Sequence, residues 1–307
     1  MRYLLRMVPK AGWICLTVGV LLQAFAKDRY PGLALFFYAL PKPCLAVLSV
    51  TLLVWPGMRR KSRLFAAVTA LAITGWWVSA SWVHRQDQAT VPQVDGRELK
   101  VLFWNLCRPR GLDLEMVELV RRFQPDVAAF VEPGPQAGPL AAEYEKLLPG
   151  YRVEFMPRGV LWVTRVPSRF QGRGKLEGAG AFARFEVTGL GPPFPFVVAD
   201  VYPHVLHSRE PQLQEALAHA QDRDDAILMG DFNTPAESVF FDSYRSRYVD
   251  AFETAGYGFR ETWPLGLPLL SLDHIWVGKD WAVIAAQKLN LLSGSDHAAL
   301  LVTLRRR

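Results

Sequence analysis

The distribution of apolar residues divides the chain into two parts. Three long apolar runs, at residues 11–26, 32–55 and 64–83, fill most of the first 84 positions. Each run is long enough, or nearly so, to cross the hydrocarbon core of a bilayer as a helix. Beyond residue 98 the apolar runs become short and are separated by Gly and Pro, a pattern typical of a globular domain. We therefore predict a membrane segment at 1–84, a polar linker at 85–97 and a separate domain at 98–307.

The details of the apolar runs favour membrane helices. The first run has the length of a signal peptide, but no small-residue cleavage site leads to a polar mature start, and two more runs follow. Pro41 and Pro43 interrupt the second run. We favour one kinked helix over a re-entrant pair there, because neighbouring helices can satisfy the backbone groups that proline frees. The alternative is a helical bundle buried within a soluble protein.

Charge predicts the orientation of this segment. Arg2, Arg6 and Lys10 precede the first run, and four basic residues at 59–63 separate the second from the third. The positive-inside rule places both groups in the cytoplasm. Three crossings then put the domain that follows residue 83 on the extracytoplasmic side of the cell membrane.

The net charge of +6 says little about the second domain, because the basic excess lies in the membrane segment. Residues 1–95 hold 11 Lys and Arg against 3 Asp and Glu, whereas residues 96–307 hold 24 against 26. No nucleic-acid footprint is therefore indicated by charge. The three cysteines lie far apart, without the spacing of a disulfide framework or a zinc motif.

Several strand candidates of the second domain follow one another without a helix between them. Strands are expected at 99–106, 126–132, 151–155, 160–164, 181–188, 194–202, 226–229, 272–277 and 298–304, and helices at 113–123, 137–148 and 209–222. This order favours an α/β (α+β) fold class with mixed sheets over a doubly wound parallel sheet.

Polar residues recur where these strands end. Asn105, Glu132, Tyr202 and Asp231 each stand at or near the exit of an apolar run. Ligand sites of α/β proteins lie at strand ends. Burying an unpaired carboxylate such as Asp231 is costly, so a metal, a histidine or a substrate should compensate it. Two Asp-His pairs, at 273–274 and 296–297, supply further candidates.

Each candidate also has a purely structural interpretation. Asp231 and Asn233 would project to the same side of an extended backbone, but such a pair often only caps a helix or turn. Glu132 alone is typical of a loop, Tyr202 of a core, and His204 of a surface loop. Their joint recurrence at strand exits favours a functional site.

The order of these motifs resembles the endonuclease/exonuclease/phosphatase superfamily, which has the DNase-I-like fold. The matching segments, in the order of the family, are Trp104-Asn105, Val131-Glu132, Tyr202-Pro203-His204, Gly230-Asp231-Phe232-Asn233, Leu272-Asp273-His274-Ile275 and Ser295-Asp296-His297. The resemblance covers residues 98–307 and implies a sandwich of two mixed β-sheets flanked by helices.

The resemblance also implies a metal site. Glu132, with Asn105 nearby, would hold a divalent cation, and Asp296 would complete the metal or water network. Oxygen ligands without thiolates suit a hard cation, so we expect Mg²⁺, with Mn²⁺ as an alternative.

The same resemblance assigns catalytic roles. Asp231 would orient and deprotonate the attacking water, and Asn233 would steady the phosphoryl oxygens. His297, oriented by Asp273, would contact the phosphate.

Two further positions of the family pattern are less clear in this chain. Tyr202 matches a position that is Tyr in some members and His in others, and His204 is an alternative for that role. Nucleases of the apurinic-site type carry an acidic residue two positions after the Asn, where this chain has Cys107. This difference weakens the expectation of a second metal and of abasic-site repair.

Taken together, these features predict a membrane-anchored, Mg²⁺-dependent phosphoesterase that hydrolyses phosphodiesters. A metal-bound, positioned water and fixed donors are what such chemistry needs. The substrate is left open between a lipid headgroup, a small phosphodiester and nucleic acid. The alternatives are an extracytoplasmic metal-dependent nuclease and a catalytically silent, membrane-tethered binding module.

Overall fold

The computed structural model describes the whole chain except residues 1, 85–96, 205, 265, 268 and 292–293. It forms two compact units. The helical unit comprises Met1–Trp82 with the short segments His204–Ser208 and Glu237–Val239, and the C-terminal unit comprises Val83–Pro203, Arg209–Ala236 and Phe240–Arg307. Nearly all of the predicted linker lies outside the described residues.

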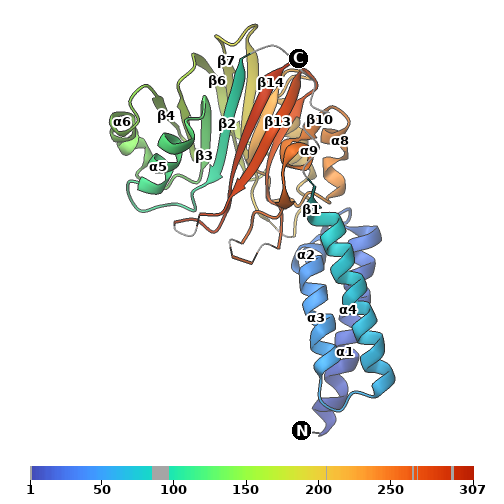
Figure 1. The fold of residues 1–307 in the computed structure, drawn as a ribbon. Helices are drawn as coiled ribbons and strands as arrows, with labels where there is room; N and C mark the ends of the chain where they lie inside the picture. The colour runs from blue at the N-terminus through green and yellow to red at the C-terminus, as the bar shows by residue number, and fades with distance from the viewer. Residues whose placement is uncertain (1, 85–96, 205, 265, 268, 292–293) are drawn as a thin grey trace. The chain divides into compact units, whose positions relative to one another are not determined.

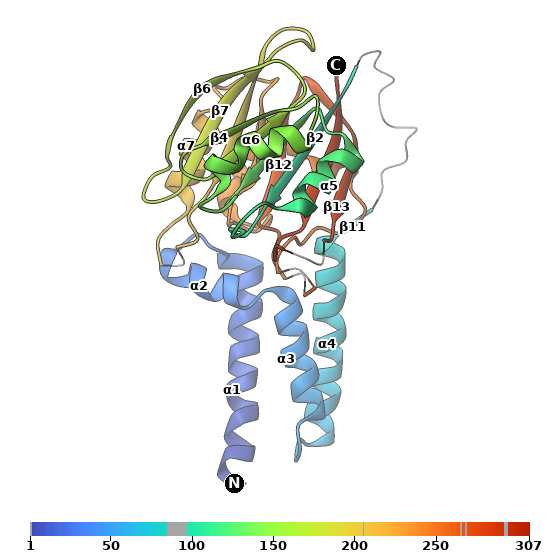
Figure 2. The ribbon, with the colours of Figure 1, turned by 90° about the vertical axis from the view of Figure 1, so that its left-hand side faces the viewer.

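Four α-helices make up most of the helical unit (Figure 1). They are α1 (Arg2–Leu21), which continues as a π-helix (Leu22–Ala26), α2 (Pro31–Ala39), α3 (Lys42–Val54) and α4 (Arg60–Ser81). Helix α3 packs against both α1 and α4, as Figure 2 shows. Gly19 of α1 permits this approach, because a Cβ there would lie 2.5 Å from Leu45 Cδ2 of α3. Small residues at such contacts are typical of membrane helices.

Among the described residues, two helical segments are long and apolar enough to cross a membrane, Met7–Ala26 and Arg60–Ser81. The second apolar run forms two helices, α2 and α3, which are bent by 61° and make a third candidate span only if they cross together. Pro41 lies at the N-cap of α3, where its ring ends α2 and starts the next helix. The run is therefore broken rather than continuously helical.

Two six-stranded mixed sheets form the centre of the C-terminal unit as the structure describes it. The first sheet has the order β13 (Trp281–Leu289), β14 (Ala299–Arg306), β2 (Glu98–Asn105), β3 (Val127–Val131), β5 (Val160–Thr164), β4 (Arg152–Met156). The second has the order β10 (Tyr248–Asp250), β12 (Asp273–Gly278), β9 (Ile227–Asp231), β8 (Phe194–Asp200), β7 (Ala181–Val187), β6 (Ser168–Lys175). The pairs β2–β3 and β8–β9 are parallel. The predicted mixed-sheet architecture is confirmed.

Alternate residues of the strands build the core between the two sheets. Val101 and Phe103 of β2 belong to the same buried cluster as Val198 of β8. Trp162 of β5 stacks on Phe185 of β7, with ring centroids 4.0 Å apart. Because side chains alternate along a strand, each sheet offers one apolar face to the other.

Helices cover the outer faces. In the first sheet, Leu102 and Trp104 of β2 pack with Met116 and Val120 of α5 (Leu114–Phe123), and Figure 2 shows α5 and α6 (Ala137–Leu147) over that sheet. Asp113 caps α5 by accepting a hydrogen bond from Met116 N at 2.9 Å. The remaining short elements are α7 (Glu210–Ala218), α8 (Asp242–Arg245), α9 (Ala251–Ala255), the 3₁₀-helix Val239–Phe241, β1 (Trp82–Val83) and β11 (Gly258–Phe259).

Five of the described strands were not predicted from the sequence: the short β1, β10 and β11, and the longer β6 and β13. The predicted strand at 194–202 was drawn too long. β6 is an edge strand with mostly exposed side chains, so it lacks the apolar pattern of a buried strand. β13 follows a short turn after β12, and no strand was predicted over its residues. β8 ends at Asp200, so Tyr202 lies two residues beyond the strand instead of within it.

Candidate active site

The topology brings several strand ends to one edge of the sandwich. Asp231 ends β9 and pairs in register with Asp273, the first residue of the antiparallel strand β12. Asn105 ends β2, next to the antiparallel strand β14, which His297 precedes by two positions. The side chains of Asn105 and Asp231 are hydrogen-bonded, so the two sheets meet at this edge.

The glycine before Asp231 is required by the close approach of β8 and β9. A Cβ at Gly230 would lie 2.1 Å from the carbonyl oxygen of Ala199, which no side chain can tolerate. The Gly-Asp pair therefore lets β9 pair tightly with β8 while it delivers a carboxylate to the end of the strand. Asp231 itself is buried.

Both oxygens of Asp231 accept hydrogen bonds. Oδ2 accepts from Asn105 Nδ2 at 2.9 Å, and Oδ1 accepts from the backbone N–H of Asn233 at 2.8 Å. Asn233 has φ of 47°, in the left-handed region. Its side-chain Nδ2 donates to Val201 O at 2.8 Å. The expected extended backbone from 231 to 233 is therefore wrong, because the chain turns sharply after Asp231.

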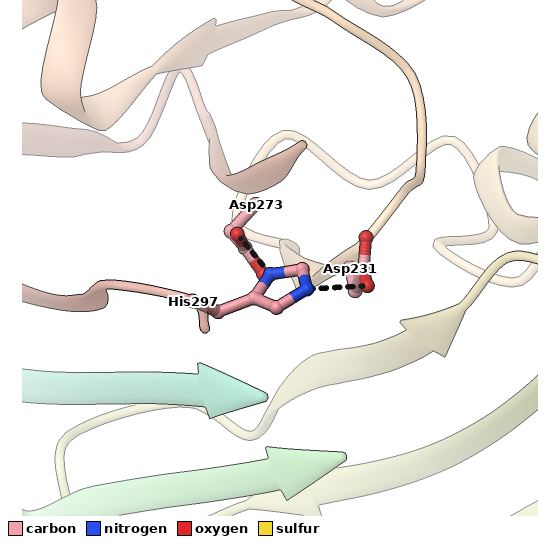
Figure 3. Close-up of side chains that lie close together, drawn as sticks. All are labelled: Asp231, Asp273 and His297. Atoms are coloured by element: carbon pink, nitrogen blue, oxygen red, sulfur yellow. Dashed lines mark hydrogen bonds and ion pairs between the residues drawn. The ribbon is translucent and has the colours of Figure 1, made fainter. Parts of the chain in front are cut away.

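His297 lies between two carboxylates, as Figure 3 shows. Its Nδ1 is 2.8 Å from Asp273 Oδ2, and its Nε2 is 3.8 Å from Asp231 Oδ2. The loop that carries it is tied to the end of β2, because Ser295 Oγ donates to Asn105 O at 2.6 Å and accepts from His297 N at 3.0 Å. The imidazole is thus oriented by both its side-chain and its backbone contacts.

Burial and neighbouring charges shift the pKa values of this pair. Burial raises the pKa of Asp231 to about 7, and the charge of Asp273 adds to this effect, while His297, Asn233 and Asn105 oppose it. Burial alone would lower the pKa of His297, but the charge and hydrogen bond of Asp273, with Asp231, raise it to about 10. His297 is therefore an imidazolium at neutral pH, and Asp231 has the pKa expected of a general base.

More carboxylates surround this pair than cations. Glu132 pairs with Arg108, with Nη2 2.7 Å from Oε1. Asp296 Oδ2 accepts from the indole of Trp263 at 2.7 Å, and its Oδ1 lies 3.9 Å from His297 Nε2. At the end of β8, the pKa of Asp200 is raised well above its usual range by burial and by the charges of Asp231 and Glu132.

Cys107 occupies the position at which nucleases of the apurinic-site type carry an acidic residue. Cys107 N donates to Asn105 Oδ1 at 2.9 Å, so both ends of the Asn105 amide are engaged within the protein. Burial, together with the charge of Asp296, raises the pKa of the Cys107 thiol. A thiol that stays protonated is a poor ligand for a hard cation.

No described contact joins the other two predicted residues, Tyr202 and His204, to His297 or Asp231. Tyr202 is 45% exposed, and its backbone N–H donates to Gln212 Oε1 at 3.0 Å. His204 belongs to the helical unit, where its Nδ1 lies 2.8 Å from His207 Nδ1.

Sequence reasoning missed Asp200 and Trp263. Asp200 is the last residue of β8 and pairs in register with Asp231 across the parallel strands. An acid at the end of an apolar run was a signal for it, but the strand was drawn two residues too long. Nothing in the sequence around Trp263 indicated its contact with Asp296, which depends on the fold.

The residues present fit a bound divalent cation. Ligand atoms of Asp231, Asp273 and His297 lie within 4.8 Å of one another. Because His297 is protonated at neutral pH, the carboxylates rather than the imidazole would bind the cation. Asp273 Oδ1 is buried and has no hydrogen-bond partner among the described residues. Five carboxylates (Asp200, Asp231, Asp273, Asp296 and Glu132) face the two cationic groups His297 and Arg108, so added positive charge would stabilise the cluster.

Comparison with known proteins shows the family. Residues 102–297 match the model of the endonuclease/exonuclease/phosphatase family, and the chain belongs to this family. No curated protein sequence matches the chain.

Solved structures share the fold. A family protein from Bacteroides thetaiotaomicron has a TM-score of 0.55 and 18% identity, over 70% of this chain and 100% of that one. The mannosyl-6-phosphatase Bt3783 from B. thetaiotaomicron VPI-5482 has a TM-score of 0.54 and 18% identity, over 67% of this chain and 99% of that one. D. rerio TDP2, complexed with a single-stranded DNA product, has a TM-score of 0.52 and 16% identity, over 68% of this chain and 99% of that one. The predicted family and DNase-I-like fold are confirmed.

Proposed function

We propose that this chain is a membrane-anchored, divalent-metal-dependent phosphoesterase that hydrolyses phosphodiesters on the extracytoplasmic side. The observation that best supports it is the buried His297, which Asp273 holds at 2.8 Å and which faces Asp231 across 3.8 Å. That gap is too long for a direct hydrogen bond, but one oxygen atom can lie within hydrogen-bond distance of both groups. A water or a phosphoryl oxygen fits this position.

The proton chemistry follows from the two pKa values. Asp231, with its pKa raised to about 7, accepts a proton from the attacking water. His297, with its pKa raised to about 10, donates its Nε2–H to a phosphoryl oxygen, and Asp273 maintains the orientation of the ring. The water oxygen bonds to phosphorus and the ester P–O bond breaks. The leaving alkoxide takes a proton from solvent water, and Asp231 returns its proton to solvent.

Other residues would bind the substrate and the cation. Glu132, with Asn105, would hold Mg²⁺ or Mn²⁺, and Asp296 would complete the water network. A bound divalent cation neutralises phosphate charge and activates water. The ion pair with Arg108 engages only Oε1 of Glu132, so Oε2 would bind the cation while the exposed guanidinium approaches the phosphate.

Donors on the loop side complete the proposal. Asn233, whose backbone N–H already holds Asp231, would steady the phosphoryl oxygens. The exposed phenol of Tyr202 would approach the phosphate, and His204 is the alternative for this role.

The test is hydrolysis of bis(p-nitrophenyl) phosphate by the purified full-length chain with Mg²⁺, Mn²⁺ or EDTA. EDTA is expected to abolish turnover, and Asp231→Asn and His297→Ala should each lower kcat by about 10²–10⁴-fold. Asp242→Asn, which changes an exposed carboxylate of α8, serves as the control and should leave kcat unchanged. Equal turnover in the wild type and both site variants would sink the assignment. Comparison with p-nitrophenyl phosphate and plasmid DNA then separates diesterase, monoesterase and nuclease activity.

A further inference from the structure

The loop that joins Thr262 to Ser271, here called the 263–270 loop, is apolar and lies beside the candidate active site. Its sequence is Trp-Pro-Leu-Gly-Leu-Pro-Leu-Leu, without a charged residue, and the indole of Trp263 is its only side chain with a hydrogen-bonding group. Residues 265 and 268 lie outside the described part. The inference rests on the six others.

Backbone hydrogen bonds give the 263–270 loop a defined shape. Trp263 and Leu270 form an antiparallel bridge, in which Leu270 N donates to Trp263 O at 2.8 Å and Trp263 N donates to Leu270 O at 2.9 Å. Nearer the tip, Leu267 N donates to Pro264 O at 3.1 Å. The loop is therefore closed at its base, and a turn-type hydrogen bond links Leu267 to Pro264.

This shape leaves apolar side chains in solvent. Leu267 is 70% exposed, and Leu269 and Leu270 are only partly buried. Burying a leucine side chain stabilises by roughly 2 kcal/mol. Exposed and partly exposed leucines in a loop without charged residues therefore favour binding of an apolar ligand.

The base of the 263–270 loop touches the catalytic residues. Trp263 Nε1 donates to Asp296 Oδ2 at 2.7 Å, and its ring centroid lies 6.5 Å from that of His297. A phosphate held at His297 would therefore lie near the indole, so that one of its ester groups can extend along the ring. The group that follows this ester oxygen would continue toward the aliphatic side chains of the loop.

We propose that Trp263, Leu267, Leu269 and Leu270 bind the hydrocarbon chain of a lipid phosphoester whose phosphate is hydrolysed at His297 and Asp231. The proposal rests on the proposed phosphoesterase function and names its substrate class. The indole covers the part of the chain next to the phosphate, and Leu267, Leu269 and Leu270 cover the part beyond it. The apolar helices of the same chain favour a lipid environment, in which such a substrate is abundant.

A nucleic-acid strand fits the same loop less well. Strand binding relies on cationic grooves and several stacking aromatic rings. The loop has no Lys or Arg and one aromatic ring, and residues 96–307 hold 24 basic against 26 acidic residues. Aliphatic side chains supply neither charge nor stacking.

The test compares two soluble diesters, ethyl and hexyl p-nitrophenyl phosphate, with the full-length chain in lipid nanodiscs. In the wild type, kcat/KM is expected to be about tenfold or more higher for the hexyl ester, because four more methylenes are buried. Leu267→Gln, at an exposed position that leaves the core intact, should lower this ratio about threefold or more.

The matched control is Val249→Gln, which also replaces an exposed aliphatic side chain. Val249 pairs with Val277, four residues and roughly 13 Å along β12 from Asp273. It should leave the ratio of the two esters unchanged.

The outcomes separate the two levels of the proposal. If the wild type hydrolyses neither ester with Mg²⁺, the phosphoesterase function is wrong and the lipid proposal falls with it. If both esters are hydrolysed but the ratio is unaffected by Leu267→Gln, only the lipid proposal is overturned. It is also overturned if Leu267→Gln lowers cleavage of a single-stranded oligonucleotide and leaves the ratio unchanged.

Discussion

At the scale of single residues, His297 shows how neighbours set the chemistry of a side chain. Burial alone would make the imidazole neutral, yet the charge and hydrogen bond of Asp273 raise its pKa to about 10. The same Asp273 raises the pKa of Asp231, after burial. One buried carboxylate thus favours an acid and a base that face each other.

Replacing Asp273 tests this coupling. Asp273→Asn keeps the shape but removes the charge, so the pKa of His297 should fall and kcat on bis(p-nitrophenyl) phosphate should drop about 10²–10⁴-fold. NMR titration of His297 and steady-state kinetics measure the two effects. A variant with normal kcat would show that Asp273 has no part in orienting the imidazole.

His219 gives a prediction for stability away from the site. Its ring stacks on Phe182, with centroids 3.6 Å apart, and its Nε2 has no hydrogen-bond partner among the described residues. Burial lowers the pKa of His219, while the charge of Glu215 opposes this. The folded state therefore favours the neutral ring, and the wild type loses stability as the pH falls through the unfolded value of about 6.5.

The substitution His219→Gln removes this titration. Between about pH 7.5 and about pH 5.5, the free energy of unfolding should fall less in the variant than in the wild type. Denaturant unfolding at the two pH values measures the difference. An equal fall in both proteins would mean that His219 does not contribute to acid sensitivity.

Strand exits made part of the site predictable from sequence. Asn105, Asp231, Asp273 and His297 follow or precede apolar runs, and the structure brings all four into contact. Asp200 was missed because the predicted strand was drawn to Tyr202, which placed the wrong residue at its exit. Its pairing with Asp231 depends on the register of β8 and β9, which periodicity does not reveal.

At the scale of elements, one residue links the strands that carry the site. Thr262 is buried, and its Oγ1 accepts from Leu272 N at 3.0 Å and Asp273 N at 3.2 Å. Its carbonyl oxygen accepts from Ala298 N at 2.9 Å. Thr262 therefore holds the start of β12 through its hydroxyl and the residue after His297 through its carbonyl oxygen.

Thr262→Val keeps the shape of the side chain but leaves buried N–H groups without an acceptor. The free energy of unfolding should fall by about 1–3 kcal/mol, and kcat should fall more than KM changes, because Asp273 shifts relative to His297. Thr262→Ser, which retains the hydroxyl, should restore both. Denaturant unfolding and kinetics on bis(p-nitrophenyl) phosphate measure the series. Full activity in the Val variant would refute the positioning role.

The elements themselves were largely predictable where one face is buried. β2, β3, β5 and β9 are apolar runs between turn formers, and α5 has helical spacing with an N-cap at Asp113. β6 is edge-exposed and contains Gly172 and Gly174, so neither period nor composition indicated a strand. The register that joins both sheets at Asn105 and Asp231 is a tertiary property.

At the scale of the whole molecule, the number of crossings decides on which side of the membrane the C-terminal unit lies. If α2 and α3 cross together, the chain has three crossings and the unit is extracytoplasmic. If this bent pair is re-entrant, only Met7–Ala26 and Arg60–Ser81 cross. The unit would then lie on the same side as the N-terminus.

Charge favours three crossings. Basic residues precede the first span and also fill positions 59–63 before α4. The positive-inside rule puts both groups in the cytoplasm, and this requires an even number of crossings between them. A re-entrant α2–α3 pair would leave one crossing between them and place the four basic residues at 59–63 outside.

Reporter fusions after Arg85 test this argument. A reporter that is active only outside the cytoplasm should be active there, and one that is active only in the cytoplasm should be silent. Replacing Arg59, Arg60, Lys61 and Arg63 by Asn should reduce the first signal and raise the second, since charge is what orients the loop. A cytoplasmic signal from the wild-type fusion would overturn the extracytoplasmic placement. It would mean that α2 and α3 are re-entrant or that the orientation is reversed, and in both cases the substrate is cytoplasmic.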